Sequence, residues 1–245
     1  IDIMKFNKRL YIKNCLKELI TSGIIIIGVI VAVIPPVILM YYIINYESNS
    51  FYIKHISNFF CIFGLYIGVL SPLYFINRDF SMDTITLVCN TKENRIAYLN
   101  ANVLLAFFLS LFYSSIGVAT VLIANYLGVT GDLTVNFIIG FLCNLTITIV
   151  FYYLFSYLLF SFFIKSNVVF SFLTLLLLFI PNIISNILYS TQNELLNNLF
   201  EKIPMYFLPI YAGSNIMEVS QYIISILSIC ILYTLSMKKT LNLRF

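Results

Sequence analysis

Long apolar runs separated by short polar segments dominate the pattern of this chain. The runs are about as long as the roughly 20 residues that an α-helix needs to cross a bilayer, so the pattern predicts six membrane-spanning helices. The polar segments between the runs are too short to fold as separate domains. We therefore expect an all-α membrane protein with one transmembrane domain over residues 21–237, with spans at 21–45, 57–77, 98–124, 137–163, 168–189 and 219–237.

Residues 1–20 precede the first run and follow a different pattern. Apolar side chains recur there at helical spacing, and cations lie between them, among them Lys8, Arg9, Lys13 and Lys17. A helix with an apolar side and a basic side lies in the membrane interface. The segment therefore predicts an amphipathic elbow helix that leads into the first span. The simpler alternative is a basic flank that only fixes topology and touches anionic lipid.

Lysine and arginine are distributed unevenly among the segments that flank the spans. Alternate segments lie on the same side of a membrane, and 12 of the 14 cations fall on one side. This richer set comprises residues 1–20, 78–97, Lys165 and the basic tail 238–245, whereas the other set holds Lys54 and Lys202. Because cation-rich connections stay in the cytoplasm, both termini are expected to be cytoplasmic.

Composition narrows the function classes further. Hydrophobic residues make up 61% of the chain and charged residues 10%, far from the roughly 25% charged residues of soluble domains, so a soluble enzyme is excluded. The predicted spans contain no Asp, Glu, Lys or Arg, and the only histidine, His55, lies outside them. Ion-coupled carriers and intramembrane proteases need such groups inside the membrane. We expect no catalytic, metal or cofactor site on this chain, and the five cysteines show no metal or disulfide spacing.

The connection at 78–97, RDFSMDTITLVCNTKENRIA, stands out because it carries six charges in a charge-poor chain. Asp83 and Thr84 are suited to start a short helix. In that helix Ile85, Leu87 and Val88 are expected to form an apolar side. A solvated loop does not need such a pattern.

This connection resembles the first cytoplasmic loop of ABC-2 type transporter permeases. The resemblance lies in an acidic residue, a threonine, aliphatic residues, a polar turn and an arginine before the next span. The six spans and the elbow helix extend this resemblance over nearly the whole chain. The resemblance implies the ABC-2 (type V exporter-like) fold, in which this loop is a coupling helix that docks on a separate ATPase subunit. The residues implied in coupling are Asp79, Asp83, Thr84, Ile85, Leu87, Lys92 and Arg95.

Partners follow from the same resemblance. No glycine is followed by lysine, so the chain lacks a Walker phosphate loop, and ATP and Mg are expected on the partner ATPase. A second permease chain, identical or different, is implied to complete the path in a bacterial plasma membrane. Membrane lipid is a further expected partner. Nucleic acid is not, since the cations flank the spans.

Aromatic side chains on the second and fifth spans are candidates for a cargo path, because the resemblance places these spans beside it: Phe60, Phe63, Tyr66, Phe172 and Phe179. Lipid-facing aromatics are the simpler explanation. The outer segment 190–217 is expected to be interfacial or re-entrant. We expect an exporter of amphipathic or apolar cargo, most like the bacterial peptide exporters of phenol-soluble modulins or lantibiotics. Export of lipid, polysaccharide or drug, and a non-transporting accessory subunit, are the alternatives.

Small and polar residues inside the spans carry two packing expectations. Gly64 and Gly68 form a G-x-x-x-G pattern that permits close helix approach. Asn144, Thr146 and Thr148 in the fourth span are expected to face protein rather than lipid. The prolines at Pro35-Pro36 and at Pro181-Asn182 predict kinks in the first and fifth spans.

Overall fold

The computed structural model describes residues 6–46, 51–82, 84–180, 183, 195, 213 and 217–242, and the regular structure in these parts is entirely helical. Five helices are long and apolar enough to cross a membrane. They are α2 (Ile24–Asn45), α3 (Ile53–Ser81), α5 (Lys92–Tyr126), α6 (Val135–Ser161) and α11 (Val219–Leu241). The prediction of an all-α chain with the features of a membrane protein is confirmed at this level.

Three shorter α-helices and one π-helix complete the described structure. They are α1 (Lys8–Thr21), α4 (Thr84–Val88), α7 (Ser166–Thr174) and the π-helix η1 (Leu175–Phe179). α7 and η1 together begin the predicted span 168–189, but they are shorter than the five long helices. The rest of that span, including Pro181-Asn182, and most of segment 190–217 lie outside the described residues, so a sixth span stays a prediction.

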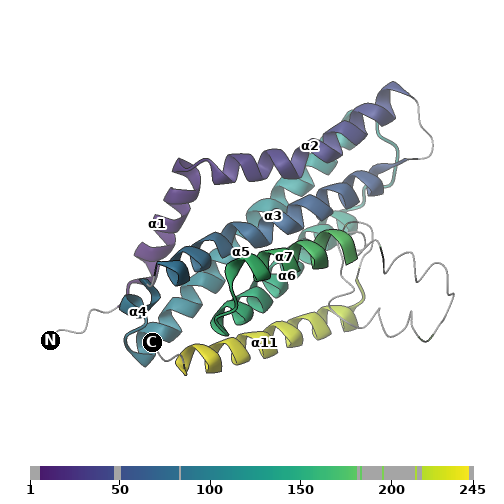
Figure 1. The fold of residues 1–245 in the computed structure, drawn as a ribbon. Coiled ribbons are helices and arrows are strands. Elements are labelled where there is room, and N and C mark those ends of the chain that lie inside the picture. Colours follow the sequence, from purple (N-terminus) through teal and green to yellow (C-terminus); the bar gives the residue numbers. More distant parts are fainter. Residues whose placement is uncertain are drawn as a thin grey trace.

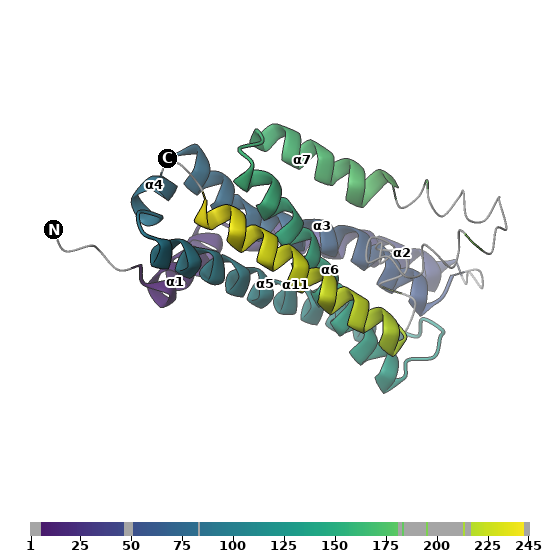
Figure 2. The same cartoon turned by 90° about the horizontal axis from the view of Figure 1, so that it is seen from below.

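The long helices pack as a bundle with α6 and α3 at its centre (Figures 1 and 2). In the most apolar 18-residue stretch of α6, 72% of the residues are buried, against 22% in that of α2 and 11% in that of α11. α2 packs on α3, α11 packs on α6, and α5 contacts both central helices. α2 and α11 therefore form the edges of the bundle and expose mainly apolar side chains, as lipid or a second chain would require.

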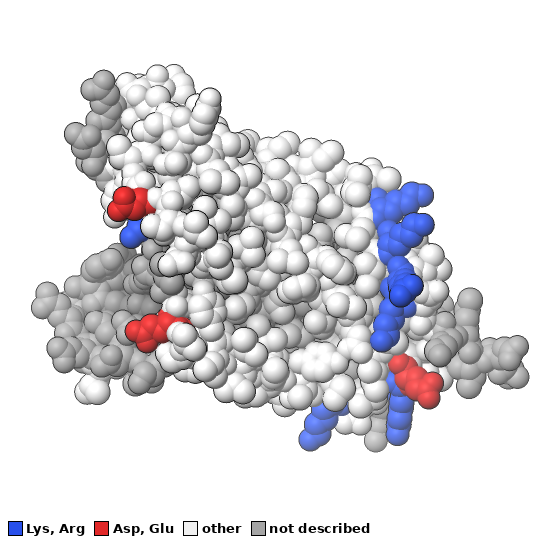
Figure 3. Space-filling model, turned by 180° about the vertical axis from the view of Figure 1, so that it is seen from behind, with Lys and Arg blue, Asp and Glu red and all other residues white. Residues whose placement is uncertain are grey.

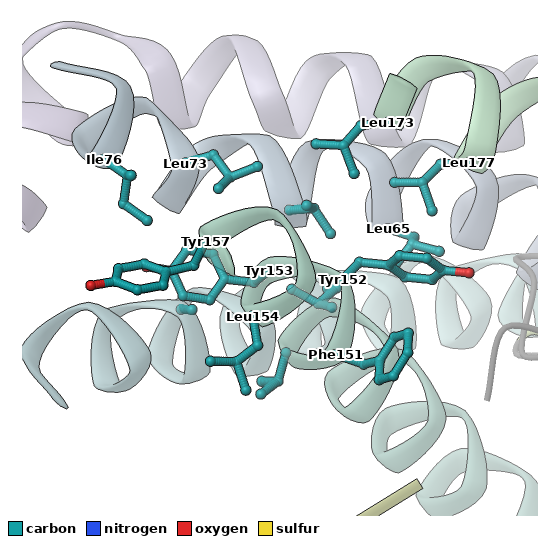
Figure 4. Packing of buried hydrophobic residues seen from close by; sticks show 14 of the residues in the cluster. Leu65, Leu73, Ile76, Phe151, Tyr152, Tyr153, Leu154, Tyr157, Leu173 and Leu177 are labelled. Atoms are coloured by element: carbon teal, nitrogen blue, oxygen red, sulfur yellow. The ribbon is translucent and has the colours of Figure 1, made fainter. Parts of the chain in front are cut away.

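The core is built around the aromatic side chains of α6. Tyr152, Tyr153 and Tyr157 are fully buried and lie among leucine and isoleucine side chains of α3, α7 and η1 (Figure 4). A Cβ added at Gly68 of α3 would lie 2.5 Å from Ile149 Cδ1 of α6, so the close approach expected at this glycine is confirmed. Gly64 instead leaves room for the ring of Phe60 on its own helix.

Polar side chains inside the bundle bond to one another. Asn144, Thr146 and Thr148 are buried, as predicted. Ser114 and Thr146 lie 3.0 Å apart through their hydroxyl oxygens, which joins α5 to α6. The Tyr222 hydroxyl of α11 donates to Asn144 Oδ1 at 2.8 Å. These bonds remove the cost of burying polar groups away from water.

A sharp turn separates α1 from α2. Asn7 caps the start of α1 by accepting a hydrogen bond from the backbone N–H of Leu10 at 3.1 Å. Gly23, between α1 and α2, has φ of 75°, a left-handed conformation that glycine adopts without steric cost. α1 consequently lies at a steep angle to α2 and occupies the segment where the elbow helix is expected (Figure 1).

Candidate functional site

Cations gather at one end of the bundle, where α3, α6 and α11 end and α5 and α7 begin. On the face drawn in Figure 3 the blue side chains form a band at this end. We call it the basic end. Of the described Lys and Arg residues, only Lys54 belongs to the opposite end; those at the basic end are Lys8, Arg9, Lys13, Lys17, Arg78, Lys92, Arg95, Lys165, Lys238 and Lys239.

Asp79 lies at the centre of a hydrogen-bonded network at the basic end. α3 continues past the predicted edge of its span to Ser81, which places Asp79 inside the protein with 5% of its surface exposed. Arg78 donates from Nε and Nη2 to Asp79 Oδ1 at 3.0 and 2.9 Å. The hydroxyls of Tyr11 and Tyr98 donate to Oδ2 at 2.7 and 2.9 Å. A buried carboxylate needs such partners, since an unpaired one is very costly.

The network reaches further along the elbow helix. Arg78 also forms an ion pair with Glu18 of α1, and the Tyr74 hydroxyl donates to the same carboxylate at 3.3 Å. Burial and the nearby Asp79 carboxylate raise the pKa of Tyr11 well above its ordinary value. The Tyr11 hydroxyl therefore stays protonated and remains a donor. Through these contacts α1 is fixed to the end of α3.

α4 is hydrogen-bonded to this network. The Thr84 hydroxyl donates to the backbone carbonyl of Asp79 at 3.1 Å. Ile85 is only 2% exposed and packs in the core, whereas Leu87 is 77% exposed. The short helix was predicted, and Ile85 and Val88 both face the core, but the expectation that Leu87 shares their side is wrong, because residues one or two apart on a helix point in different directions.

Arg95 ties the segment after α4 to the last helix. Its Nε donates to the backbone carbonyl of Cys89 at 2.8 Å, and its Nη1 donates to that of Leu241, at the end of α11, also at 2.8 Å. A second link joins Tyr157 of α6 to Thr240 of α11, whose hydroxyl oxygens lie 3.0 Å apart. Through Arg95, the connection between α3 and α5 is therefore linked to the end of α11.

The residues predicted to couple to an ATPase thus come together around α4 but differ in exposure. Asp79 and Ile85 are buried and Arg95 is half-buried on backbone carbonyls, so they support α4 from inside. Leu87 and Lys92 are exposed. Thr84 is half-buried, and Asp83 lies outside the described residues.

The second short connection, between α6 and α7, lies beside the end of α3. A cavity of about 180 Å³ lies between the end of α3 and this connection, and it is lined by Asn77, Phe80, Ser81, Phe160, Phe163, Ile164 and Ser166. Phe163 has φ of 58°, which is strained for an aromatic residue and keeps the turn tight. Phe162 is exposed and its ring centroid lies 4.2 Å from Lys239 Nζ of α11.

The remaining predicted residues fall into two groups. The elbow cations Lys8, Arg9, Lys13 and Lys17 are all exposed. The cargo-path candidates do not share one surface: Phe60 is fully buried in the core, Phe63 and Tyr66 are half-buried, and Phe172 and Phe179 are exposed. Tyr66 and Thr174 lie 2.9 Å apart through their hydroxyl oxygens and join α3 to α7.

The tyrosines that donate hydrogen bonds to the Asp79 carboxylate were not predicted from the sequence. Tyr11 and Tyr98, which donate to Asp79, were not predicted as site residues, and neither was Asn102. Asn102 is a polar residue inside an apolar run, and this pattern could have identified it from the sequence. Its side-chain oxygen accepts a long hydrogen bond from the Tyr11 hydroxyl at 3.4 Å. Met82, apolar and exposed beside α4, was also missed.

Among the described residues, no cluster of three His, Cys, Asp or Glu side chains is placed to hold a metal ion. Comparison with known proteins gives no assignment: no protein-family model matches the chain, and no curated protein matches it.

Proposed function

We propose that this chain is the membrane-spanning subunit of an ATP-driven exporter of the ABC-2 type, and that a separate ATPase docks at the basic end. One observation carries the proposal. α4 exposes Leu87 at the surface, while its base is hydrogen-bonded to the Asp79 network that joins α1, α3 and α5. An ATPase bound to this surface would displace α4, and the hydrogen bonds at the base of α4 would transmit the displacement to the long helices.

The transmission of force follows from the contacts at the base of α4. Asp79 holds Tyr11 and Tyr98, and Arg95 holds the end of α11, so displacement of α4 displaces the ends of several long helices together. Packed interfaces switch between discrete arrangements rather than deforming continuously. We propose that closure of the ATPase pair moves α4 and that the interface between two permease chains is the bistable element.

The docking surface combines apolar and charged side chains, as transient protein interfaces do. Met82 and Leu87 supply exposed apolar groups, and Lys92 supplies a cation nearby. The cavity beside Phe163, between the end of α3 and the connection from α6 to α7, supplies a further, concave contact. ATP and Mg would be held by the ATPase, and this chain would carry no catalytic residue.

The proposed class of cargo rests on apolar side chains that are exposed on α7 and η1. Phe172 on α7 and Phe179 in η1 expose 40% and 57% of their surfaces. A path bordered by these side chains and completed by a second chain would suit amphipathic peptides. With the basic end in the cytoplasm of a bacterial cell, the direction proposed is outward.

Co-purification tests the docking site. The tagged chain is purified from cells that express its native operon, and the bound ATPase is quantified for wild type, Leu87→Asp and Leu127→Asp. Leu127 is exposed beyond the opposite end of α5, so it controls for the same charge change. We expect Leu87→Asp to lower ATPase recovery at least about tenfold, since a charge replaces a central apolar contact. Equal recovery with both variants would contradict docking at α4.

Stimulation by cargo tests the transport class. The purified complex is assayed for ATP hydrolysis with and without amphipathic helical peptides, and polar peptides of equal length serve as the control. Stimulation by the amphipathic peptides alone supports peptide export. An ATPase that binds but does not respond would point to another cargo, and no bound ATPase would favour an accessory subunit.

A further inference from the structure

A shallow groove of about 550 Å³ runs along α1, on a face that the Asp79 network does not use. Its volume falls within the range of about 300 to 1,000 Å³ that is typical of ligand sites. The lining combines an apolar floor with a basic rim and comprises Arg9, Ile12, Lys13, Leu16, Lys17, Ile20 and Thr21 of α1 with Phe108 of α5.

The helical repeat sorts these residues into two parallel rows. Ile12, Leu16 and Ile20 are spaced four residues apart, and so are Arg9, Lys13 and Lys17. Side chains with this spacing lie above one another on a helix. An apolar row therefore runs beside a row of cations along the middle of α1, and Phe108 extends the apolar row onto the bundle.

The cations of the groove have no anionic partner within the described residues. Arg9, Lys13 and Lys17 are exposed and form no ion pair there. Glu18, the acidic residue of α1, is bound to Arg78 and does not line the groove. Three uncompensated positive charges thus border an apolar surface, which is complementary to a molecule with an anionic head and a hydrocarbon tail.

We propose that this groove binds an anionic phospholipid. The phosphate lies against Arg9, Lys13 and Lys17, and an acyl chain lies along Ile12, Leu16, Ile20 and Phe108. A soluble anion would leave the apolar floor exposed to water. A lipid is also close at hand, because α1 leads through Gly23 directly into α2, a helix long enough to span the membrane. The proposal needs only that α2 crosses a membrane and does not depend on the proposed function.

Native mass spectrometry of the full chain tests the site, after purification in mild detergent and addition of phosphatidylglycerol or phosphatidylcholine. The variant Arg9→Gln/Lys13→Gln/Lys17→Gln is compared with Lys92→Gln/Lys165→Gln/Lys238→Gln. The second variant removes the same charge from exposed positions elsewhere at the basic end. Each cation near an anionic surface contributes roughly a factor of five in affinity. We expect the groove variant to lose phosphatidylglycerol binding at least about tenfold and the control variant to retain it.

Two further measurements separate the lipid from other ligands. Ile20→Asn, at an exposed position of the floor, should weaken phosphatidylglycerol binding, and glycerol 3-phosphate should not compete with the lipid. Equal binding of phosphatidylcholine, equal losses in both triple variants, or competition by glycerol 3-phosphate would each overturn the proposal. Displacement of the lipid only by an amphipathic peptide that binds with higher affinity would overturn it in favour of a peptide site.

Discussion

At the scale of single residues, Asp79 is the most informative position. Among the described residues it is the only buried charged side chain. Arg78, Tyr11 and Tyr98 supply four hydrogen bonds to its carboxylate. A bond to a charged group contributes more than a neutral one, and loss of a partner leaves the charge less compensated. Removal of either tyrosine hydroxyl should therefore lower the free energy of unfolding.

The tyrosines of the bundle offer a matched test of that argument. Tyr98→Phe removes the donor to Asp79 Oδ2 and should lower the free energy of unfolding by about 1.5 to 3 kcal/mol. Tyr153 is equally buried, but its hydroxyl has no hydrogen-bond partner among the described residues, so Tyr153→Phe should be neutral or slightly stabilising. Thermal unfolding of the detergent-solubilised variants measures the difference. Similar losses in both variants would show that the hydroxyl bond to Asp79 is not the cause.

At the scale of elements, the sequence predicted where helices occur better than where they end. The apolar runs gave α2, α3, α5, α6 and α11, because burial of apolar side chains forms those helices. Their ends depend on polar groups. α5 begins at Lys92, six residues before the predicted span, because the Thr91 side chain caps it by accepting from the N–H of Asn94 at 3.2 Å.

Contacts between distant residues could not be read from the sequence in the same way. Tyr11 and Asp79 are 68 residues apart, and Arg95 and Leu241 are 146 apart. Tyr11, Asp79 and Arg95 each look like a solvated polar residue near a membrane edge, and the bond to Leu241 uses only its backbone carbonyl. Only the packing of α1, α3, α5 and α11 brings these residues together, so Asp79 and Arg95 were predicted as surface contacts while the fold uses them as internal supports.

The exposed side of α4 and Cys89, the residue that follows this helix, give a second test. Leu87→Cys should react rapidly with maleimide at pH 8, because Leu87 is exposed. The native Cys89 should stay unreacted, because it is buried and because burial raises the pKa of its thiol to about 12 despite the nearby Arg95. The reactive thiolate therefore forms at Cys89 only as the pH approaches that value. Peptide-level mass spectrometry measures both sites, and fast labelling of Cys89 at pH 8 would mean that α4 is not packed as described.

At the scale of the whole molecule, the order of the helices constrains the path of the chain. α2 and α5 run away from the basic end, and α3, α6 and α11 run back to it (Figures 1 and 2). α7 begins at the basic end, whereas α11 begins at the opposite end, where Tyr222 meets Asn144. The described parts therefore place Ser166 and Met217 toward opposite ends of the bundle. An even number of crossings stays a prediction.

This path predicts the sidedness of two exposed connections. Asp132 lies between α5 and α6 at the opposite end, and Lys165 lies between α6 and α7 at the basic end. In intact cells a membrane-impermeant maleimide should label Asp132→Cys, and it should label Lys165→Cys only after the membrane is permeabilised, because the cation-rich end stays in the cytoplasm. Site-resolved mass spectrometry separates these positions from the native cysteines. Labelling of both in intact cells would place them on one side and contradict the crossing of α6, while the reverse pattern would invert the chain and remove the basic end from reach of a cytoplasmic ATPase.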